Sequence, residues 1–208
     1  MKSLIVIMLC SISAASFAQR LSNFVSAGMG TSMEDNIEGC TNQNRMRYIG
    51  SMSLYYRITD RISIGAEAIG SNRLSIFGNS SCDVTDPSDN SLKLGPSNMR
   101  AGTVLMHTRM KLLNYKEMEP YIDMGVGINT YYYSIPLNDA GTVQKRSFVY
   151  SPEVGISMYK FQFACKLIMG AKTPSYSAID SESNRMVSLK SVRAQQVYLT
   201  IGYQLFKL

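Results

Sequence analysis

Eight segments of this chain alternate apolar side chains with polar or small ones at a period of two, and this feature constrains the fold most. Such alternation is typical of β-strands that have one apolar face and one polar face. Each segment is long enough to cross a hydrocarbon layer as a tilted strand, for which about 9 to 11 residues suffice. The predicted strands cover residues 21–31, 47–57, 61–71, 98–113, 120–132, 147–158, 161–172 and 191–207.

The connections between these segments alternate between short and long. All long connections therefore lie at one end of the sheet, and both chain ends lie at the other. This arrangement is typical of even-stranded outer-membrane barrels, in which closure also removes free sheet edges that lipid does not tolerate. The sequence thus predicts an all-β fold, an eight-stranded antiparallel up-and-down transmembrane β-barrel. The short connections are 58–60, 114–119 and 159–160, and the long ones are 32–46, 72–97, 134–146 and 173–190.

Residues 1–18 have the features of a secretory signal peptide. Lys2 supplies a charged start, an apolar run follows, and Ser16-Phe17-Ala18 forms a small-x-small cleavage pattern. The apolar run is shorter than the roughly 20 residues that a transmembrane helix needs. We therefore expect cleavage between Ala18 and Gln19, Sec-type export, and a barrel domain over residues 19–208 that is integral to the bacterial outer membrane.

Composition argues against several classes of function. Charged residues make up 17% of the chain, and its net charge of +6 is spread without a basic run, so we expect no nucleic-acid binding. The chain has one histidine, His107, and no Gly-x-Ser-x-Gly motif. We accordingly expect no catalytic, cofactor-binding or metal-binding residues.

Three cysteines remain after the signal peptide is removed. Cys40 and Cys82 lie in the first two long connections, which are neighbours in a closed meander. A disulfide between them would tie two loops together in an oxidising compartment, and two free thiols are the alternative. Cys165 falls on the apolar face of its strand, where it serves as a small apolar residue.

The strand face opposite the aliphatic side chains carries charges of both signs. Eight strands enclose an interior just wide enough for side chains to fill, and buried charges need partners. We therefore predict a charge network that packs the lumen, with a narrow selective conduit as the alternative. Its predicted members are Arg57, Glu67, His107, Arg109, Lys111, Asp123, Glu153 and Lys166.

Tyrosine and phenylalanine concentrate near the ends of the predicted strands. In membrane barrels such residues form belts at the two membrane interfaces. The predicted belt at the short-turn end contains Tyr55, Tyr56, Tyr115, Tyr121, Tyr159, Phe161, Tyr203 and Phe206, and that at the long-loop end contains Tyr48, Tyr131, Tyr132, Tyr133, Phe148 and Tyr150.

Three segments carry a family resemblance: the hairpin 57–67 (RITDRISIGAE), the stretch 119–127 (EPYIDMGVG) and the closing 199–203 (LTIGY). They resemble small outer-membrane β-barrel domain proteins, most of all the porin-family, PorT-like group of Bacteroidota type, and more distantly OmpA- and OmpX-like barrels. The resemblance covers essentially the whole mature chain and lies in a repeated style of strand and turn. It implies the barrel fold and the outer-membrane location.

We expect a non-enzymatic, monomeric barrel with a structural, adhesive or surface-recognition role, and no cofactor. Its expected partners are outer-membrane lipid and an extracellular protein or glycan, bound through loops 32–46, 72–97, 134–146 and 173–190. The alternatives are a small porin or channel, a lipid-modifying barrel enzyme with His107 as general base, and a secreted lipocalin-like carrier. The carrier would face its aliphatic side chains inward around a ligand.

Overall fold

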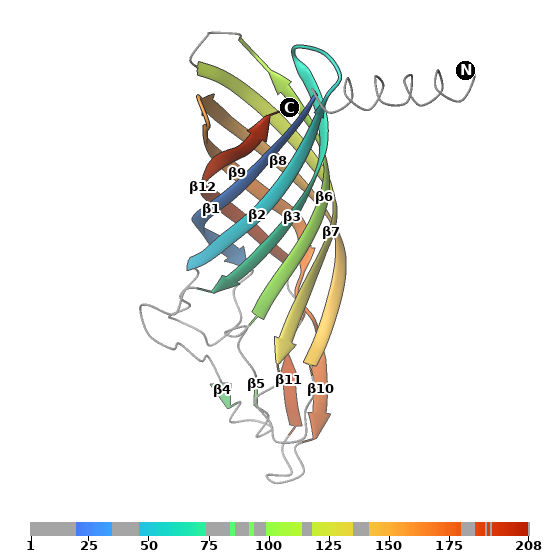
Figure 1. Ribbon diagram of the computed structural model, residues 1–208. Coiled ribbons are helices and arrows are strands. Elements are labelled where there is room, and N and C mark those ends of the chain that lie inside the picture. The colour runs from blue at the N-terminus through green and yellow to red at the C-terminus, as the bar shows by residue number, and fades with distance from the viewer. Residues whose placement is uncertain are drawn as a thin grey trace, which may run out of the picture.

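Eight antiparallel strands form a closed barrel in the spatial order β1-β12-β9-β8-β7-β6-β3-β2 (Figure 1). The predicted fold class is confirmed. The strands are β1 (Leu21–Glu34), β2 (Met46–Arg57), β3 (Ile62–Arg73), β6 (Met99–Lys111), β7 (Met118–Ser134), β8 (Thr142–Met158), β9 (Phe161–Lys172) and β12 (Arg193–Lys207).

The computed structural model describes residues 20–34, 46–73, 84–85, 92–93, 99–113, 118–134, 142–179, 186–189, 191 and 193–207. Within these ranges, no helix is both long enough and apolar enough to span a membrane. Residues 1–19 lie outside the described part, and so do Cys40 and Cys82. The cleavage site at Ala18 and Gln19 and the disulfide therefore stay predictions. Cys165 is a free, half-buried thiol.

The first and last strands close the barrel. They pair from Ser22↔Lys207 to Glu34↔Ala194, while β1 also pairs with β2 on its other side. Consecutive strands meet at short turns at one end, where β1 begins and β12 ends, and we call this the turn end (top of Figure 1). The opposite end is the loop end. Closure gives each barrel strand two ladder partners, as an apolar surrounding requires.

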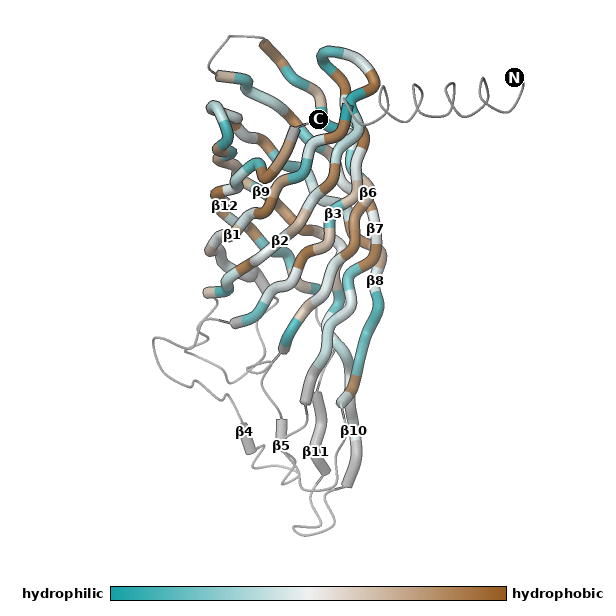
Figure 2. Tube along the Cα trace, in the orientation of Figure 1, coloured by the Kyte–Doolittle hydropathy of each residue, from teal (hydrophilic) through white to brown (hydrophobic). Residues whose placement is uncertain are grey.

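The outer wall is apolar and the interior is polar, as the alternation predicted. Along β7, Ile122 and Val126 are exposed, while Asp123 between them is buried. Figure 2 shows this alternation as hydrophobic and hydrophilic residues that succeed one another along the strands. A lipocalin-like carrier would have the opposite arrangement, so the barrel wall argues against that alternative.

The hairpin of β7 and β8 is longer than the sequence predicted. Its ladder reaches Ser134↔Thr142, so the predicted loop 134–146 is wrong and only residues 135–141 connect the two strands. Residues 142–146 (TVQKR) have no apolar outer face and therefore resemble a loop in sequence. They form a strand because pairing with β7 uses backbone groups alone. An apolar outer face is needed only where a strand crosses an apolar layer.

Two of the predicted long loops contain a second sheet. Its strands are β4 (Val84–Thr85), β5 (Leu92–Lys93), β10 (Tyr176–Ile179) and β11 (Met186–Leu189), in the order β10-β11-β5-β4. Strand β11 pairs in parallel with β5 through Val187↔Leu92 and Ser188↔Lys93, which joins segment 72–97 to segment 173–190. The sheet lies beyond the loop end, at the bottom of Figure 1. Strands this short carry no detectable period, so the sequence did not predict them.

A bulge in β9 corrects one further assignment. Strict alternation predicts that Gly170 lies on the inner face with Lys166, but Gly170 is exposed and Ala171 is buried. Ala171 pairs with Ala194 and Ile168 pairs with Gln196, so two β9 residues stand opposite one β12 residue. Gly170 has φ +89°, a backbone conformation that glycine adopts readily. The extra residue shifts the alternation by one position.

A charge on the outer wall tests this arrangement. Leu199 is 69% exposed on β12, and Leu199→Arg should destabilise the membrane-inserted barrel by roughly 2–4 kcal/mol because it places a cation against hydrocarbon. The measurement is the urea midpoint in lipid vesicles, followed by heat-dependent gel mobility. Ile58→Arg, in the exposed turn between β2 and β3, is the matched control and should cost about 0–1 kcal/mol. Equal losses in the two variants would contradict the assignment of the wall.

Candidate functional site: a packed charge cluster in the lumen

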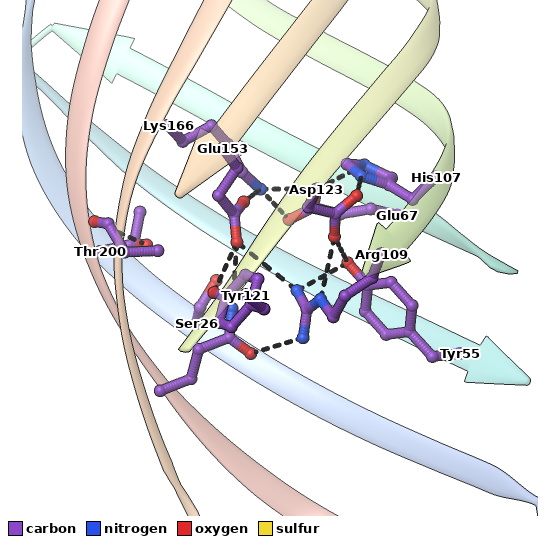
Figure 3. Close-up of polar contacts among 12 residues, drawn as sticks. Ser26, Tyr55, Glu67, His107, Arg109, Tyr121, Asp123, Glu153, Lys166 and Thr200 are labelled. Atoms are coloured by element: carbon purple, nitrogen blue, oxygen red, sulfur yellow. Dashed lines mark hydrogen bonds and ion pairs between the residues drawn. The ribbon is translucent and has the colours of Figure 1, made fainter. Parts of the chain in front are cut away.

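Six charged side chains converge inside the turn-side half of the barrel from five adjacent strands (Figure 3). Each of them is buried. They are Glu67 of β3, His107 and Arg109 of β6, Asp123 of β7, Glu153 of β8 and Lys166 of β9, and we call them the lumen charge cluster.

His107 links two carboxylates from opposite sides. Its Nδ1 lies 2.9 Å from Asp123 Oδ1, and its Nε2 lies 2.9 Å from Glu67 Oε2. Because each ring nitrogen faces a carboxylate, this arrangement suits an imidazolium that is protonated on both nitrogens. The cluster then contains three carboxylates and three cations, and it is neutral.

Lys166 links the other pair of carboxylates. Its Nζ donates to both oxygens of Glu67, at 2.5 and 2.6 Å, and lies 3.0 Å from Glu153 Oε2. The ammonium thus connects β3 to β8 across the lumen. A buried ammonium requires this close matching because isolated charges are costly in such surroundings.

Arg109 lies between two tyrosine rings. Its Cζ is 4.1 Å from the ring centroid of Tyr55 and 4.0 Å from that of Tyr121 (Figure 3). Its Nε donates to Asp123 Oδ2 at 3.0 Å, and its Nη2 donates to the Tyr55 hydroxyl at 2.9 Å. The guanidinium is therefore held by cation–π contacts, hydrogen bonds and charge at once.

Uncharged side chains add further hydrogen bonds to the carboxylates of the cluster. Tyr55 donates to Asp123 Oδ2 at 2.7 Å, and Tyr121 donates to Glu153 Oε1 at 2.7 Å. Gln162 donates to the same Glu153 oxygen at 3.1 Å and accepts from Arg109 at 3.1 Å. The network therefore includes β2 as well, and it ties six of the eight barrel strands together.

The sequence interpretation of three tyrosines was wrong. Tyr55 and Tyr121 were expected in the interfacial belt at the turn end and Tyr131 in the belt at the loop end, yet all three are buried in the lumen. The alternation along β7 indicates the inner face for two of them, because Tyr121 lies two residues from Asp123, and Tyr131 lies two residues from Asn129. The position near a strand end was the weaker signal.

A glycine makes room for the imidazole. Gly125 stands directly opposite His107 in the β6–β7 ladder, and a Cβ on Gly125 would lie 2.7 Å from His107 Cε1. Any larger residue would displace the ring from its two carboxylates. This cross-strand pair explains why β7 carries a glycine beside the cluster.

Two predicted members lie outside the cluster. The Nζ of Lys111 pairs with Glu119 Oε2 at 2.5 Å, where both side chains are partly exposed at the turn end. Arg57 is half-buried at the same end, where its backbone N–H donates to the carbonyl of Arg20. Alternation along a strand gives the face on which a residue lies, but not its height along the barrel axis. The prediction therefore included these two residues in the cluster.

The loop-side half of the lumen is filled by a different layer, the apolar plug. Tyr198 donates to Gln196 Oε1 at 2.6 Å, Gln196 Nε2 donates to the hydroxyl of Tyr131, and the guanidinium carbon of Arg47 lies 5.8 Å from the Tyr131 ring centroid. Around them pack the buried apolar side chains Ile49, Ile69, Ala101, Leu105, Val149, Ile168, Ala171 and Ala194. The alternation in the sequence did not predict this layer, although Leu105 shares the inner face of β6 with His107.

Comparison with known proteins shows the fold of this chain. No family model and no curated protein matches it. The crystal structure of Neisserial surface protein A (NspA) is similar with a TM-score of 0.58, at 9% identity over 90% of this chain and 97% of that one. Two other structures have lower TM-scores: OprG from Pseudomonas aeruginosa, with 0.49 at 10% identity (88% and 95% covered), and Ail of Yersinia pestis, with 0.46 at 9% identity (89% and 97%). The likeness to NspA supports the closed eight-stranded barrel as the fold of this chain.

The importance of the cluster can be tested at Asp123. Asp123→Ala should lower the free energy of unfolding by about 3–5 kcal/mol, because it removes the carboxylate that His107 and Arg109 share and leaves the buried cluster with one unbalanced positive charge. The measurement is the urea midpoint of the barrel in lipid vesicles. Glu119→Gln breaks the partly exposed pair with Lys111 and serves as the control, with an expected loss under about 1 kcal/mol. A loss at Asp123 no larger than at Glu119 would show that the cluster does not stabilise the barrel.

Proposed function

We propose that this chain is an integral protein of the bacterial outer membrane, with residues 1–18 as the signal peptide that directs its export. The barrel has a closed lumen and a recognition surface at the loop end. It acts as a monomer without enzymatic activity and without a cofactor. The observation that carries this proposal is the lumen, which two successive layers of buried side chains fill. The resemblance to the PorT-like group of Bacteroidota supports the same location.

The closed lumen argues against the porin alternative. A channel needs a continuous hydrated path, whereas the lumen charge cluster joins strands on opposite sides of the turn-side half. Leu105 and Tyr131 in the apolar plug have no exposed surface at all. Side chains therefore occupy the lumen at both levels, as expected for a barrel of eight strands.

The position of His107 argues against the enzyme alternative. A general base must reach a substrate proton, directly or through one water. Both ring nitrogens of His107 face carboxylates of the cluster, and its side chain is buried. We therefore assign His107 a structural role.

The loop end supports recognition. The parallel pairing of β5 with β11 connects two long segments that leave the barrel between different strand pairs. A loop surface held by its own sheet presents a defined shape to an extracellular protein or glycan, at less ordering cost on binding than unconnected loops. The barrel serves as the anchor that holds this surface outside the membrane.

Conductance tests the closed lumen. The full chain, reconstituted in planar lipid bilayers, should produce no discrete current steps, because no hydrated path crosses its two packed layers. Heat-dependent gel mobility on the same preparation confirms that the barrel is folded, and a protein-free bilayer gives the background. Reproducible steps of one size from folded protein would support the porin alternative instead.

The loop sheet is tested at Ser188, which pairs with Ser177 on one side and Lys93 on the other. Ser188→Pro should speed tryptic cleavage within segments 72–97 and 173–190 several-fold, because proline has no backbone N–H to donate and fits poorly inside a sheet. Heat-dependent mobility of the barrel should be retained. Ser188→Ala is the matched control and should leave cleavage unchanged. Identical cleavage of both variants would contradict a structured loop surface.

A further inference from the structure

The outer wall contains a hollow of about 570 Å³ near the loop end, on β3, β6, β7 and β8. This volume falls within the range of small-ligand sites, about 300–1,000 Å³. Apolar side chains of Ala68, Val104 and Ile128 line it, and Thr130, Tyr132 and Arg146 line its other part. The hollow is therefore apolar along one side and polar with a cation along the other.

The floor of the hollow is a row of glycines in register. Gly70 pairs with Gly102, and Gly102 pairs with Thr130, which in turn pairs with Arg146. Gly50 extends the row on β2 as the partner of Gly70. A Cβ added at Gly50, Gly70 or Gly102 would meet no atom within 4 Å, so these glycines are not required for packing between strands. They leave open space on the outer wall.

Two arginines stand beside this hollow. Arg146 lines it at the β8 end of the glycine row. Arg100 lies two residues nearer the loop end than Gly102 and pairs directly with Tyr132, another lining residue. Both arginines are exposed. The carboxylates described on β3, β6, β7 and β8 are Glu67, Asp123 and Glu153 in the lumen and Glu119 at the turn end, so none of these reaches the two guanidinium groups.

The opposite side of the hollow continues into the apolar wall. Ala68 pairs with Val104, Val104 with Ile128, and Ile128 with Phe148, so one cross-strand row borders the glycine row toward the turn end. Phe148 is 69% exposed. An elongated ligand that spans both sides would have an apolar body toward the membrane interior and an anionic group toward the loop end.

We propose that this hollow binds an anionic phospholipid of the loop-side leaflet, with an acyl chain over the glycine row and a phosphomonoester head group at Arg100 and Arg146. This inference rests on the proposed membrane location. The arginine forks match phosphate oxygens, and basic residues near a membrane surface attract anionic lipid. The apolar side of the hollow matches the acyl chain of the lipid. The arginines lie nearer the loop end than this apolar side, as the head group of such a lipid requires.

A single reporter makes the site measurable. The chain has no tryptophan, so Phe148→Trp introduces a unique fluorophore beside Ile128, on the border of the hollow. The full chain with this change is reconstituted in phosphatidylcholine vesicles that contain either brominated phosphatidic acid or brominated phosphatidylcholine at the same mole fraction. The relative binding constant follows from the ratio of quenching by the two brominated lipids.

Phosphatidic acid should be preferred, and the preference should fall about fivefold with each of Arg100→Gln and Arg146→Gln. Gly70→Val should reduce it as well by filling the floor, and open space at this position keeps the barrel folded. Arg61→Gln at the turn end and Ala66→Val, on the outer face of the same strand as Gly70, are matched controls that should leave the preference unchanged.

The outcomes separate this inference from the proposed function. Equal quenching by the two brominated lipids overturns the lipid site but leaves the barrel in the membrane. An equal loss of preference in Arg61→Gln and Arg146→Gln also overturns the site, because it indicates only general surface charge. No quenching by either lipid contradicts the membrane location itself, and the lipid site with it.

Discussion

Backbone hydrogen bonding in an apolar surrounding is the constraint on which the rest of this structure depends. A strand whose outer face is apolar cannot leave N–H and C=O groups free on a sheet edge, so the sheet must close on itself. The ladder between β1 and β12 supplies that closure over nearly the full length of both strands. Once the sheet is closed with eight strands, its interior has room for side chains and little else.

Closure determines what the inward side chains must do. Charged groups on the inner faces of different strands are brought to the same level and shielded from bulk water, so they must neutralise one another. Glu67, Asp123 and Glu153 therefore alternate in space with His107, Arg109 and Lys166, and two tyrosine rings enclose the guanidinium. The apolar plug completes the filling toward the loop end. The lumen is therefore a packed core with polar content.

Both surfaces proposed to bind other molecules arise from pairing between distant segments. The hollow on the wall exists because Gly70 and Gly102 lie opposite each other in the β3–β6 ladder. No local sequence pattern predicts this register. The loop sheet exists because β5 and β11 meet, although about ninety residues separate them in the chain. In each case the individual residues are unremarkable in sequence, and the register between strands makes them a surface.

The period of two by itself determined the number of barrel strands, their antiparallel order and the face on which most side chains lie, because in a strand the facing depends only on position along the chain. It determined less where a residue lies along the barrel axis, so Arg57 and Lys111 were grouped with a cluster they do not join. It also missed the bulge at Gly170 and the pairing of β5 with β11. Only the tertiary structure decided these features, because the height, register and meeting of strands depend on contacts between segments that are far apart in the sequence.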